Sequence, residues 1–340
     1  MKIDLKIIII VIVLGSCTQN SGTEKYQNRR ECIINVREKI NEIDIGDVYI
    51  SNISWPYLLD HCLIIMDYKG YDKLIHIFNK DDFTYLTGIA NRGKGPGEIA
   101  NIGHIATDEK QRKFYVKDSG KQRIFSYSLD SVLFNPAYLP EVKMEMNIKR
   151  FPLHYQYVND TLCIGTIMEP AGISDFSVLT AKWNMSTGEI TLMKYTHPKI
   201  EKKRISIAVS MEHGIYAECY HHHDLMTICS IDGELKFNIY GSKWDCKKTN
   251  EVKFYGDAAF CKDKILVLYS SGKHRTTKDG KTIIIYPTQF LVFDTDGNYL
   301  QTLETEYELI NFCYDQENNR IIMHMNEEMQ FAYLNLDGII

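Results

Sequence analysis

Residues 63–88 read LIIMDYKGYDKLIHIFNKDDFTYLTG, a stretch in which short apolar runs alternate with polar turns. The first run, 63–67, is followed by a loop and then by a second run over 73–78. Residues 79–82 tolerate the dihedral angles of a hairpin turn, and a third run follows over 83–88. Runs of this length, rich in β-branched and aromatic residues and bounded by turn residues, are typical of antiparallel β-strands.

The same pattern recurs along the chain with a period of roughly fifty residues, which is typical of propeller repeats. Runs that correspond to 63–67 begin near Phe114, Leu162, Ile215, Ile265 and Ile321. Partner strands are expected at 73–78, 122–128, 177–183, 225–231, 289–293 and 330–336, and innermost strands at 51–58, 101–107, 150–158, 205–211, 254–260 and 309–314. With a further strand after each turn, the repeats predict an all-β, six-bladed β-propeller with four-stranded antiparallel blades.

The last repeat ends at Ile340 after its third strand, so the sixth blade lacks an outer strand. An unpaired strand edge promotes unwanted association. Residues 31–43 can supply the missing strand, and we expect an N-terminal strand to join the last blade and close the ring. A single propeller domain would then span 31–340. A helical fold is not favoured, because no long segment keeps apolar residues at positions i, i+3, i+4 and i+7.

The N-terminus has the features of a secretory signal. Lys2 and Lys6 precede the apolar run 7–14, which is too short to span a bilayer. The run ends in Leu-Gly-Ser-Cys17, which resembles the lipobox of bacterial lipoproteins. The resemblance implies a signal peptide at 1–16 and a lipid-modified Cys17, with a polar tether over 17–30. The alternative is an ordinary secreted protein in which Cys17 is incidental.

A lipid on Cys17 would anchor the chain to a membrane, since each buried methylene adds about 0.8 kcal/mol of binding free energy. Thr18 follows the cysteine, where an Asp would resemble an inner-membrane retention signal. We therefore expect a lipid-anchored protein of the cell envelope at the outer membrane. Eight further cysteines are scattered without a Cys-x-x-Cys pair, so free, buried thiols are expected more than a disulfide framework.

Composition excludes one class of partner. The 340 residues include 39 Lys and Arg against 44 Asp and Glu, a formal net charge of -5, whereas nucleic-acid binding needs a basic surface. The 22 Tyr and 14 Phe suit strands better than helices. A monomer that does not bind nucleic acid is expected.

The segment Asn91-Arg92-Gly93-Lys94-Gly95-Pro96-Gly97-Glu98, the blade pattern and the lipobox together resemble the TolB-like six-bladed β-propeller lipoproteins of Bacteroidota. The resemblance covers nearly all of the mature chain and implies a fold and an envelope location, with little chemistry. A phosphate-binding glycine loop is the alternative for this segment, but it needs a following helix, and here a strand follows. We interpret the glycines as shaping a tight crossing between blades, which leaves Arg92 and Lys94 available to a ligand.

The most conspicuous polar cluster is His221-His222-His223-Asp224, between the second and third strands of the fourth repeat. Equivalent loops and the interblade segment should open on one face of the ring. Around the mouth of the channel we therefore expect the candidate ligand-binding residues Arg92, Lys94, Lys121, His221, His223, Lys273, His274 and Arg275. Consecutive histidines point in different directions, so this run alone does not predict a metal site or any other cofactor site.

Catalytic signatures are weak. Asp67, Asp108 and Asp118 lie at strand ends, where propeller enzymes often gather carboxylates around a central cation, but no ring of oxygen ligands recurs from blade to blade. No nucleophile-elbow or zinc-binding helix motif is present. A divalent cation is retained only as an alternative, and no catalytic residue is assigned.

Three functions remain open. The favoured one is a noncatalytic envelope lipoprotein whose propeller face binds a ligand or a partner protein. The second is a metal-dependent hydrolase or lyase, similar to lactonases, acting in the central channel. The third is a scaffold subunit of an envelope complex that uses the blade edges or sides.

Overall fold

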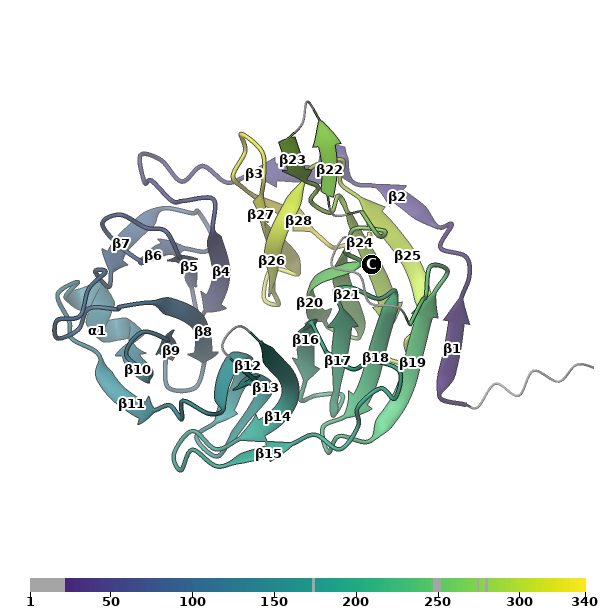
Figure 1. The fold of residues 1–340 in the computed structure, drawn as a ribbon. Helices are drawn as coiled ribbons and strands as arrows, with labels where there is room; N and C mark the ends of the chain where they lie inside the picture. Colours follow the sequence, from purple (N-terminus) through teal and green to yellow (C-terminus); the bar gives the residue numbers. More distant parts are fainter. Residues whose placement is uncertain (1–21, 173–174, 247–251, 274, 279–280) are drawn as a thin grey trace, which may run out of the picture.

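The computed structural model describes residues 22–172, 175–246, 252–273, 275–278 and 281–340. These residues form six four-stranded antiparallel blades arranged around a central axis (Figure 1). The six-bladed β-propeller predicted from the repeats is confirmed. Almost no helix is present, because each repeat alternates short apolar runs with turn residues.

The first three blades each use four consecutive strands. Blade 1 contains β4 (Ser54–Leu59), β5 (Cys62–Asp67), β6 (Ile75–Asn79) and β7 (Tyr85–Ile89). Blade 2 contains β8 (Ile102–Asp108), β9 (Lys113–Asp118), β10 (Arg123–Ser128) and β11 (Glu141–Glu145). Blade 3 contains β12 (Phe151–Asn159), β13 (Leu162–Pro170), β14 (Phe176–Trp183) and β15 (Ile190–Leu192).

The other three blades recruit N-terminal strands. Blade 4 contains β16 (Ile205–Ser210), β17 (Ile215–Tyr220), β18 (Leu225–Ser230) and β19 (Leu235–Gly241), and β1 (Glu24–Gln27) lies outside them. Blade 5 contains β20 (Tyr255–Cys261), β21 (Lys264–Tyr269), β24 (Gln289–Asp294) and β25 (Tyr299–Glu304), with β2 (Ile33–Asn35) outside. Blade 6 contains β26 (Leu309–Asp315), β27 (Arg320–Met325), β28 (Phe331–Asn335) and β3 (Ile40–Glu42).

Apolar side chains pack mainly between adjacent blades and not in one central core. Ile64 and Ile77 of blade 1 belong to the same buried cluster as Phe114 and Val116 of blade 2. The second strands β5, β17 and β27 are buried at every position, because a neighbouring blade covers each of their faces. The apolar runs from which the repeats were recognised form these second strands. Their side chains are apolar on both faces of the strand, as is typical of strands buried on two faces.

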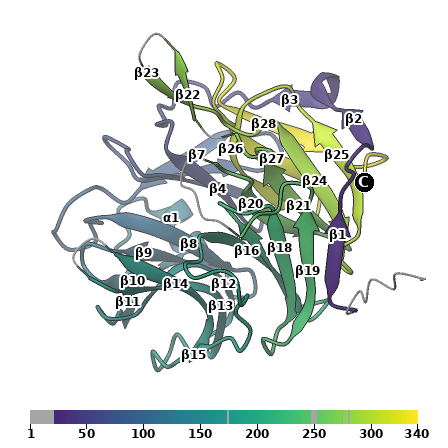
Figure 2. The same cartoon turned by 45° about the vertical axis from the view of Figure 1, so that its right-hand side comes forward.

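Residues 22–43 form an N-terminal arm that follows the outer edges of blades 4, 5 and 6 (Figures 1 and 2). Strands β1 and β2 pair in parallel with β19 and β25, and β3 pairs antiparallel with β28. Residues 24–27 lie inside the stretch expected to be a tether, so the propeller sheets begin before residue 31 and that boundary is corrected. The physical reason is packing, since Tyr26 stacks on Tyr240 with ring centroids 4.8 Å apart.

Two local features were not expected. A short helix, α1 (Leu129–Phe134), replaces the simple turn expected after β10, and the Ser128 hydroxyl caps it by accepting the Ser131 N–H at 3.2 Å. Strands β22 (Arg275–Lys278) and β23 (Lys281–Ile284) form a hairpin that projects from the ring (Figure 2). Within the described ranges, no helix has the length and apolar character needed to cross a bilayer.

Candidate ligand-binding site

The innermost strands of the six blades form the inner ring of the propeller (Figure 1). Each of β4, β8, β12, β16, β20 and β26 contacts the next one around the axis. Polar side chains from these strands and from the segments beside them form what we call the channel cluster. Its members are Tyr57, His104, Lys117, His154, Ser206, His221, Lys253 and Asp257.

One half of the channel cluster joins blades 1, 2 and 3. The Tyr57 hydroxyl lies 3.3 Å from Nδ1 of His104, and the His104 ring meets the His154 ring edge to face, with centroids 5.2 Å apart. His154 is exposed to solvent, yet desolvation and the nearby Lys117 lower its pKa to about 4. His154 lies on the innermost strand β12, which contacts the innermost strands β8 and β16 of the two adjacent blades.

Lys117 is a buried amine without a carboxylate partner in the described residues. Its Nζ donates to the carbonyl oxygens of Pro152 at 3.1 Å and Leu153 at 3.3 Å. Burial lowers the pKa of this amine to about 8, so it is mostly charged at neutral pH. Gly103 makes room for it, because a Cβ at that position would collide with Cε of Lys117.

The other half of the cluster joins blades 4 and 5. The Ser206 hydroxyl lies 2.9 Å from Nε2 of His221 and 3.4 Å from Oδ1 of Asp257. Desolvation lowers the pKa of His221 to about 3, with Lys253 contributing in the same direction. Desolvation raises the pKa of Asp257, and Lys253 and Ser206 partly offset that effect.

This arrangement supplies hydrogen-bonding groups and a small excess of positive charge. At pH 7 the three imidazoles are neutral, so each ring has one donor and one acceptor nitrogen, and both nitrogens of His104 already contact Tyr57 and the Tyr155 backbone. Ser206 lies between the histidine and the aspartate, whereas a catalytic triad places the histidine in the middle. Among the described residues, no group of three or more His, Cys, Asp or Glu side chains is arranged to hold a metal ion.

The interblade segment 91–98 carries two cationic side chains, Arg92 and Lys94. Arg92 is exposed and donates from Nη2 to the carbonyl of Tyr68 at 2.6 Å. Lys94 is exposed on the same segment. Lys121 instead braces the segment, because its Nζ donates to the carbonyls of Gly95 at 2.7 Å and Glu98 at 2.8 Å.

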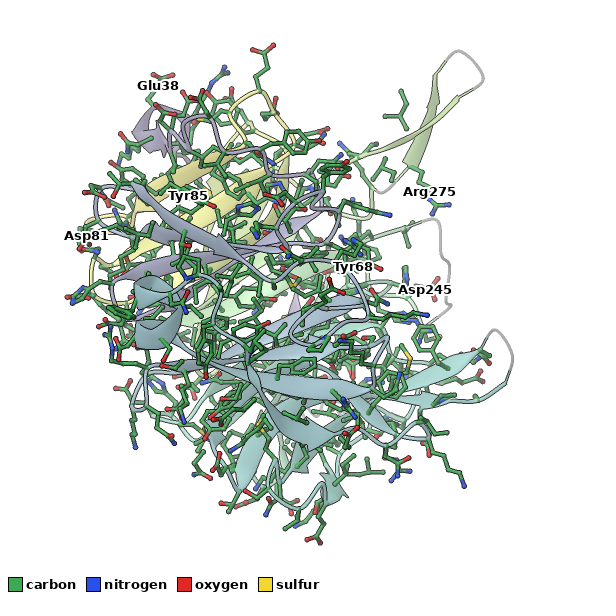
Figure 3. The ribbon with its side chains drawn as sticks, turned by 90° about the vertical axis from the view of Figure 1, so that its left-hand side faces the viewer. Glu38, Tyr68, Asp81, Tyr85, Asp245 and Arg275 are labelled. Carbon is green, nitrogen blue, oxygen red and sulfur yellow. The ribbon has the colours of Figure 1, made fainter. Side chains whose placement is uncertain are left out.

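The remaining predicted residues are spread over one face. Figure 3 shows Tyr68, Asp245 and Arg275 toward one side of the molecule, which we call the mouth face. His223 is buried there, with its Nδ1 3.0 Å from the Asp245 carbonyl, and Lys273 and Arg275 are exposed beside the projecting hairpin. Of the predicted ligand-binding residues, the structure brings only His221 into the channel cluster, while His274 and the lipidation candidate Cys17 lie outside the described residues.

The strand-end carboxylates considered for a cation have local structural roles. Asp67 accepts the Ser51 and Lys69 backbone N–H groups at 2.9 and 3.0 Å, and Asp118 accepts those of Ala100 and Asn101 at 2.8 and 2.9 Å. Asp108 accepts the Gln111 N–H at 3.2 Å. These carboxylates therefore fix the loops at the ends of the strands.

Most of the channel cluster was missed from the sequence. His104, His154, Ser206 and Asp257 each lie on an innermost strand whose range had been predicted. A polar residue inside an otherwise apolar innermost strand was the signal that could have identified them. Neighbouring residues of a strand point to opposite faces, so a single polar side chain can differ in its surroundings from the apolar residues beside it. A search confined to loops misses residues of this kind.

Comparisons with known proteins agree with the propeller fold. A model of the DUF5128 family, described as a 6-bladed beta-propeller, matches residues 44–161. A member of the duf4221 family from Bacteroides vulgatus superimposes with a TM-score of 0.56 at 12% identity, covering 87% of this chain and 95% of that one. No curated protein matches the chain.

Two other solved structures are similar in fold. A candidate exported protein from Bacteroides fragilis gives a TM-score of 0.52 at 10% identity and covers 92% of this chain and 98% of its own. A luciferin-regenerating enzyme gives a TM-score of 0.55 at 10% identity, covering 86% of this chain and 94% of its own. The chain thus has the fold of six-bladed β-propellers, and similarity at this level of identity carries no activity over to it.

Proposed function

We propose that this protein is an envelope-anchored, noncatalytic binding protein whose channel takes a small, polyhydroxylated, anionic ligand. The observation that carries the proposal is the channel cluster. Lys117 and Lys253 supply positive charge for a carboxylate or a similar anion, against the single carboxylate of Asp257. Neutral imidazoles and the Tyr57 and Ser206 hydroxyls supply donors and acceptors for ligand hydroxyl groups.

The anchor is the lipid on Cys17, and we place the protein at the outer membrane. The lipobox-like sequence and Thr18 support this location. The fold it shares with a candidate exported protein from Bacteroides fragilis is consistent with export. Metabolic labelling with a palmitate analogue tests the anchor: we expect labelling of the wild-type chain and loss of both the label and membrane association in C17S.

Calorimetric titration of the unlipidated chain tests the binding function. D-Glucuronate should bind at least about tenfold more tightly than D-glucose, a difference of about 1.4 kcal/mol, because only the acid uses the lysines. H154A should weaken glucuronate binding, while K94A, which alters an exposed lysine outside the cluster, should not. Equal binding of the two sugars, or an H154A variant identical to wild type, would contradict the proposal.

NMR of the titrated sugar distinguishes binding from catalysis. A noncatalytic protein leaves the glucuronate spectrum unchanged over hours. Appearance of a product would instead support a hydrolase or lyase acting in the channel.

A further inference from the structure

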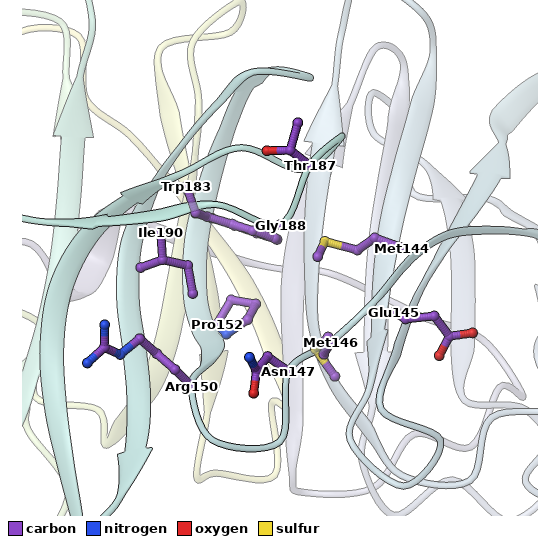
Figure 4. A pocket seen from close by; sticks show the side chains of 10 residues that line it. All are labelled: Met144, Glu145, Met146, Asn147, Arg150, Pro152, Trp183, Thr187, Gly188 and Ile190. Atoms are coloured by element: carbon purple, nitrogen blue, oxygen red, sulfur yellow. The ribbon is translucent and has the colours of Figure 1, made fainter.

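A cavity lies between blades 2 and 3, and its lining includes no member of the channel cluster (Figure 4). It has a volume of about 300 Å³ and is bounded by the end of β11, the crossover to β12 and the hairpin between β14 and β15. That volume is at the lower end of the range for small-molecule sites. We call it the interblade groove. Its lining residues include Met144, Met146, Trp183, Ile190 and Arg150.

The floor of the interblade groove is formed by buried apolar side chains. Met146 and Trp183 are 7% and 3% exposed, and both belong to the buried cluster between these blades. Nε1 of Trp183 is buried and has no hydrogen-bond partner in the described residues. This N–H has almost no accessible surface, so it does not open into the groove, and what Trp183 offers a ligand there is the apolar part of its ring.

The rim carries a cation that is only partly neutralised. Nη2 of Arg150 donates to Oε1 of Glu169 at 2.7 Å, and this is its only ion pair in the described residues. Figure 4 shows the guanidinium on the Ile190 side of the groove. Lys149 adds a second positive charge beside it, while the Glu145 carboxylate is paired with Arg123 at 2.8 Å. A guanidinium held by one carboxylate oxygen keeps further donors for another carboxylate.

From these observations we infer that the interblade groove binds a small organic acid with a flat apolar body. The body packs on Met146 and Trp183, and the thioethers of Met144 and Met146 adapt to its shape. Arg150 binds the carboxylate. None of the lining residues belongs to the channel cluster, so this inference does not rest on the function proposed for that cluster.

Proton–nitrogen NMR of the tryptophan indoles tests the proposal directly, because the chain has three tryptophans, Trp55, Trp183 and Trp244. W183F identifies the Trp183 signal by its disappearance. The probe is 3-(4-hydroxyphenyl)propionate, added to the full propeller to about 10 mM, which detects a dissociation constant near 1 mM. We expect the Trp183 signal to shift in a saturable way while the other two stay in place.

Two substitutions with opposite expected effects on affinity test the role of Arg150. R150Q should weaken binding of the acid at least about tenfold, and E169Q, which frees the guanidinium, should strengthen it. The neutral amide of the probe should bind no better than the acid binds to R150Q. Circular dichroism melting curves show whether each variant is folded.

Three results would overturn the inference. One is a Trp183 signal that does not move in the wild-type protein. Another is a shift that folded R150Q and E169Q both reproduce with unchanged affinity. The third is loss of the shift in H154A, which would place the probe in the channel.

Discussion

Arg30 of the N-terminal arm inserts between blades 4 and 5 and forms a buried ion pair with Asp224. The guanidinium lies 3.1 Å from Oδ1 of the carboxylate, and the Asp224 side chain has no exposed surface. The hydroxyls of Tyr255 and Tyr269 also donate to this carboxylate, at 3.1 and 3.2 Å. The pair therefore belongs to a buried hydrogen-bond network, in which only Nε of Arg30 lacks a partner in the described residues, and loss of one member leaves the others unpaired.

Removal of one charge from this pair should be strongly destabilising. We expect D224N to lower the free energy of unfolding by about 3–5 kcal/mol, because Arg30 then stays buried without a counter-ion. The double variant R30M/D224N should recover part of the loss. Urea denaturation measures each value, and R37M serves as the control because its pair with Glu306 is exposed and should contribute little. Equal effects of D224N and R37M would show that the buried pair has no special role.

Lys117 should titrate far below an ordinary lysine. Its pKa is lowered from 10.5 to about 8 by burial, so the unfolded chain binds more protons than the folded one between these two pH values. The desolvation cost is present below pH 8, and stability should rise as the pH increases from about 8 to 10.5. Carbon NMR of ¹³C-labelled lysine, assigned with K117M, measures the titration.

The titration of Lys117 should also change the affinity for the proposed ligand. Affinity for glucuronate should fall as the pH rises through about 8, because the amine loses its charge. A Lys117 signal that titrates near 10, or an affinity that stays constant across this range, would contradict the assignment.

At the scale of elements, the N-terminal arm adds one strand to the outer edge of each of blades 4, 5 and 6. Without the arm, the outer strands of these blades would have an unpaired edge. A chain that begins at residue 23 keeps β1, β2 and β3, whereas one that begins at residue 37 loses β1, β2 and the buried Val36. We expect the shorter chain to melt at a lower temperature and its β19 and β25 amides to exchange faster with solvent. Unchanged exchange in these two strands would show that the arm does not protect them.

The backbone approach between β12 and β13 is a second feature of element scale. A Cβ on Gly165 would collide with the His154 carbonyl oxygen and lie 2.5 Å from Cα of Tyr155. G165A should therefore displace β12, lower the melting temperature and weaken glucuronate binding through His154. G172A is the matched control, since nothing lies within 4 Å of its added methyl group. A G165A variant as stable as G172A would rule out this close approach.

The sequence predicted the positions of strands better than it predicted which strands pair and which side chains meet across blades. The innermost strand expected at 205–211 is observed as β16, because alternating apolar residues and flanking turns are local signals. The pairing of Tyr26 and its neighbours with β19 spans more than two hundred residues, and a short polar strand has no local signal for a distant edge. The channel cluster was missed for the same reason, since the meeting of Ser206 and Asp257 depends on how two blades pack.

For the whole molecule, contacts between the first and last blades bring the two ends of the repeat array together. Lys80 of blade 1 pairs with Glu317 of blade 6 at 2.6 Å, and the Asn311 side chain donates to the Ser54 carbonyl at 2.7 Å. His324, which has no exposed surface, lies with Nδ1 3.1 Å from the same carbonyl. Because apolar clusters join every pair of adjacent blades, an unfavourable change at this junction affects the stability of the entire ring.

Acid should therefore destabilise the ring before most carboxylates titrate. Desolvation lowers the pKa of His324 to about 4, below the ordinary 6.5, so the unfolded chain binds more protons between these pH values. Stability should fall as the pH decreases from about 6.5 toward 4, with His324 contributing up to about 1.4 kcal/mol per pH unit. Urea denaturation between pH 7 and 5 should give a shallower slope for H324Q and an unchanged slope for H61Q, whose side chain is exposed. If both variants keep the wild-type slope, the buried histidine at the blade 6 and blade 1 junction does not contribute to the acid sensitivity of the ring.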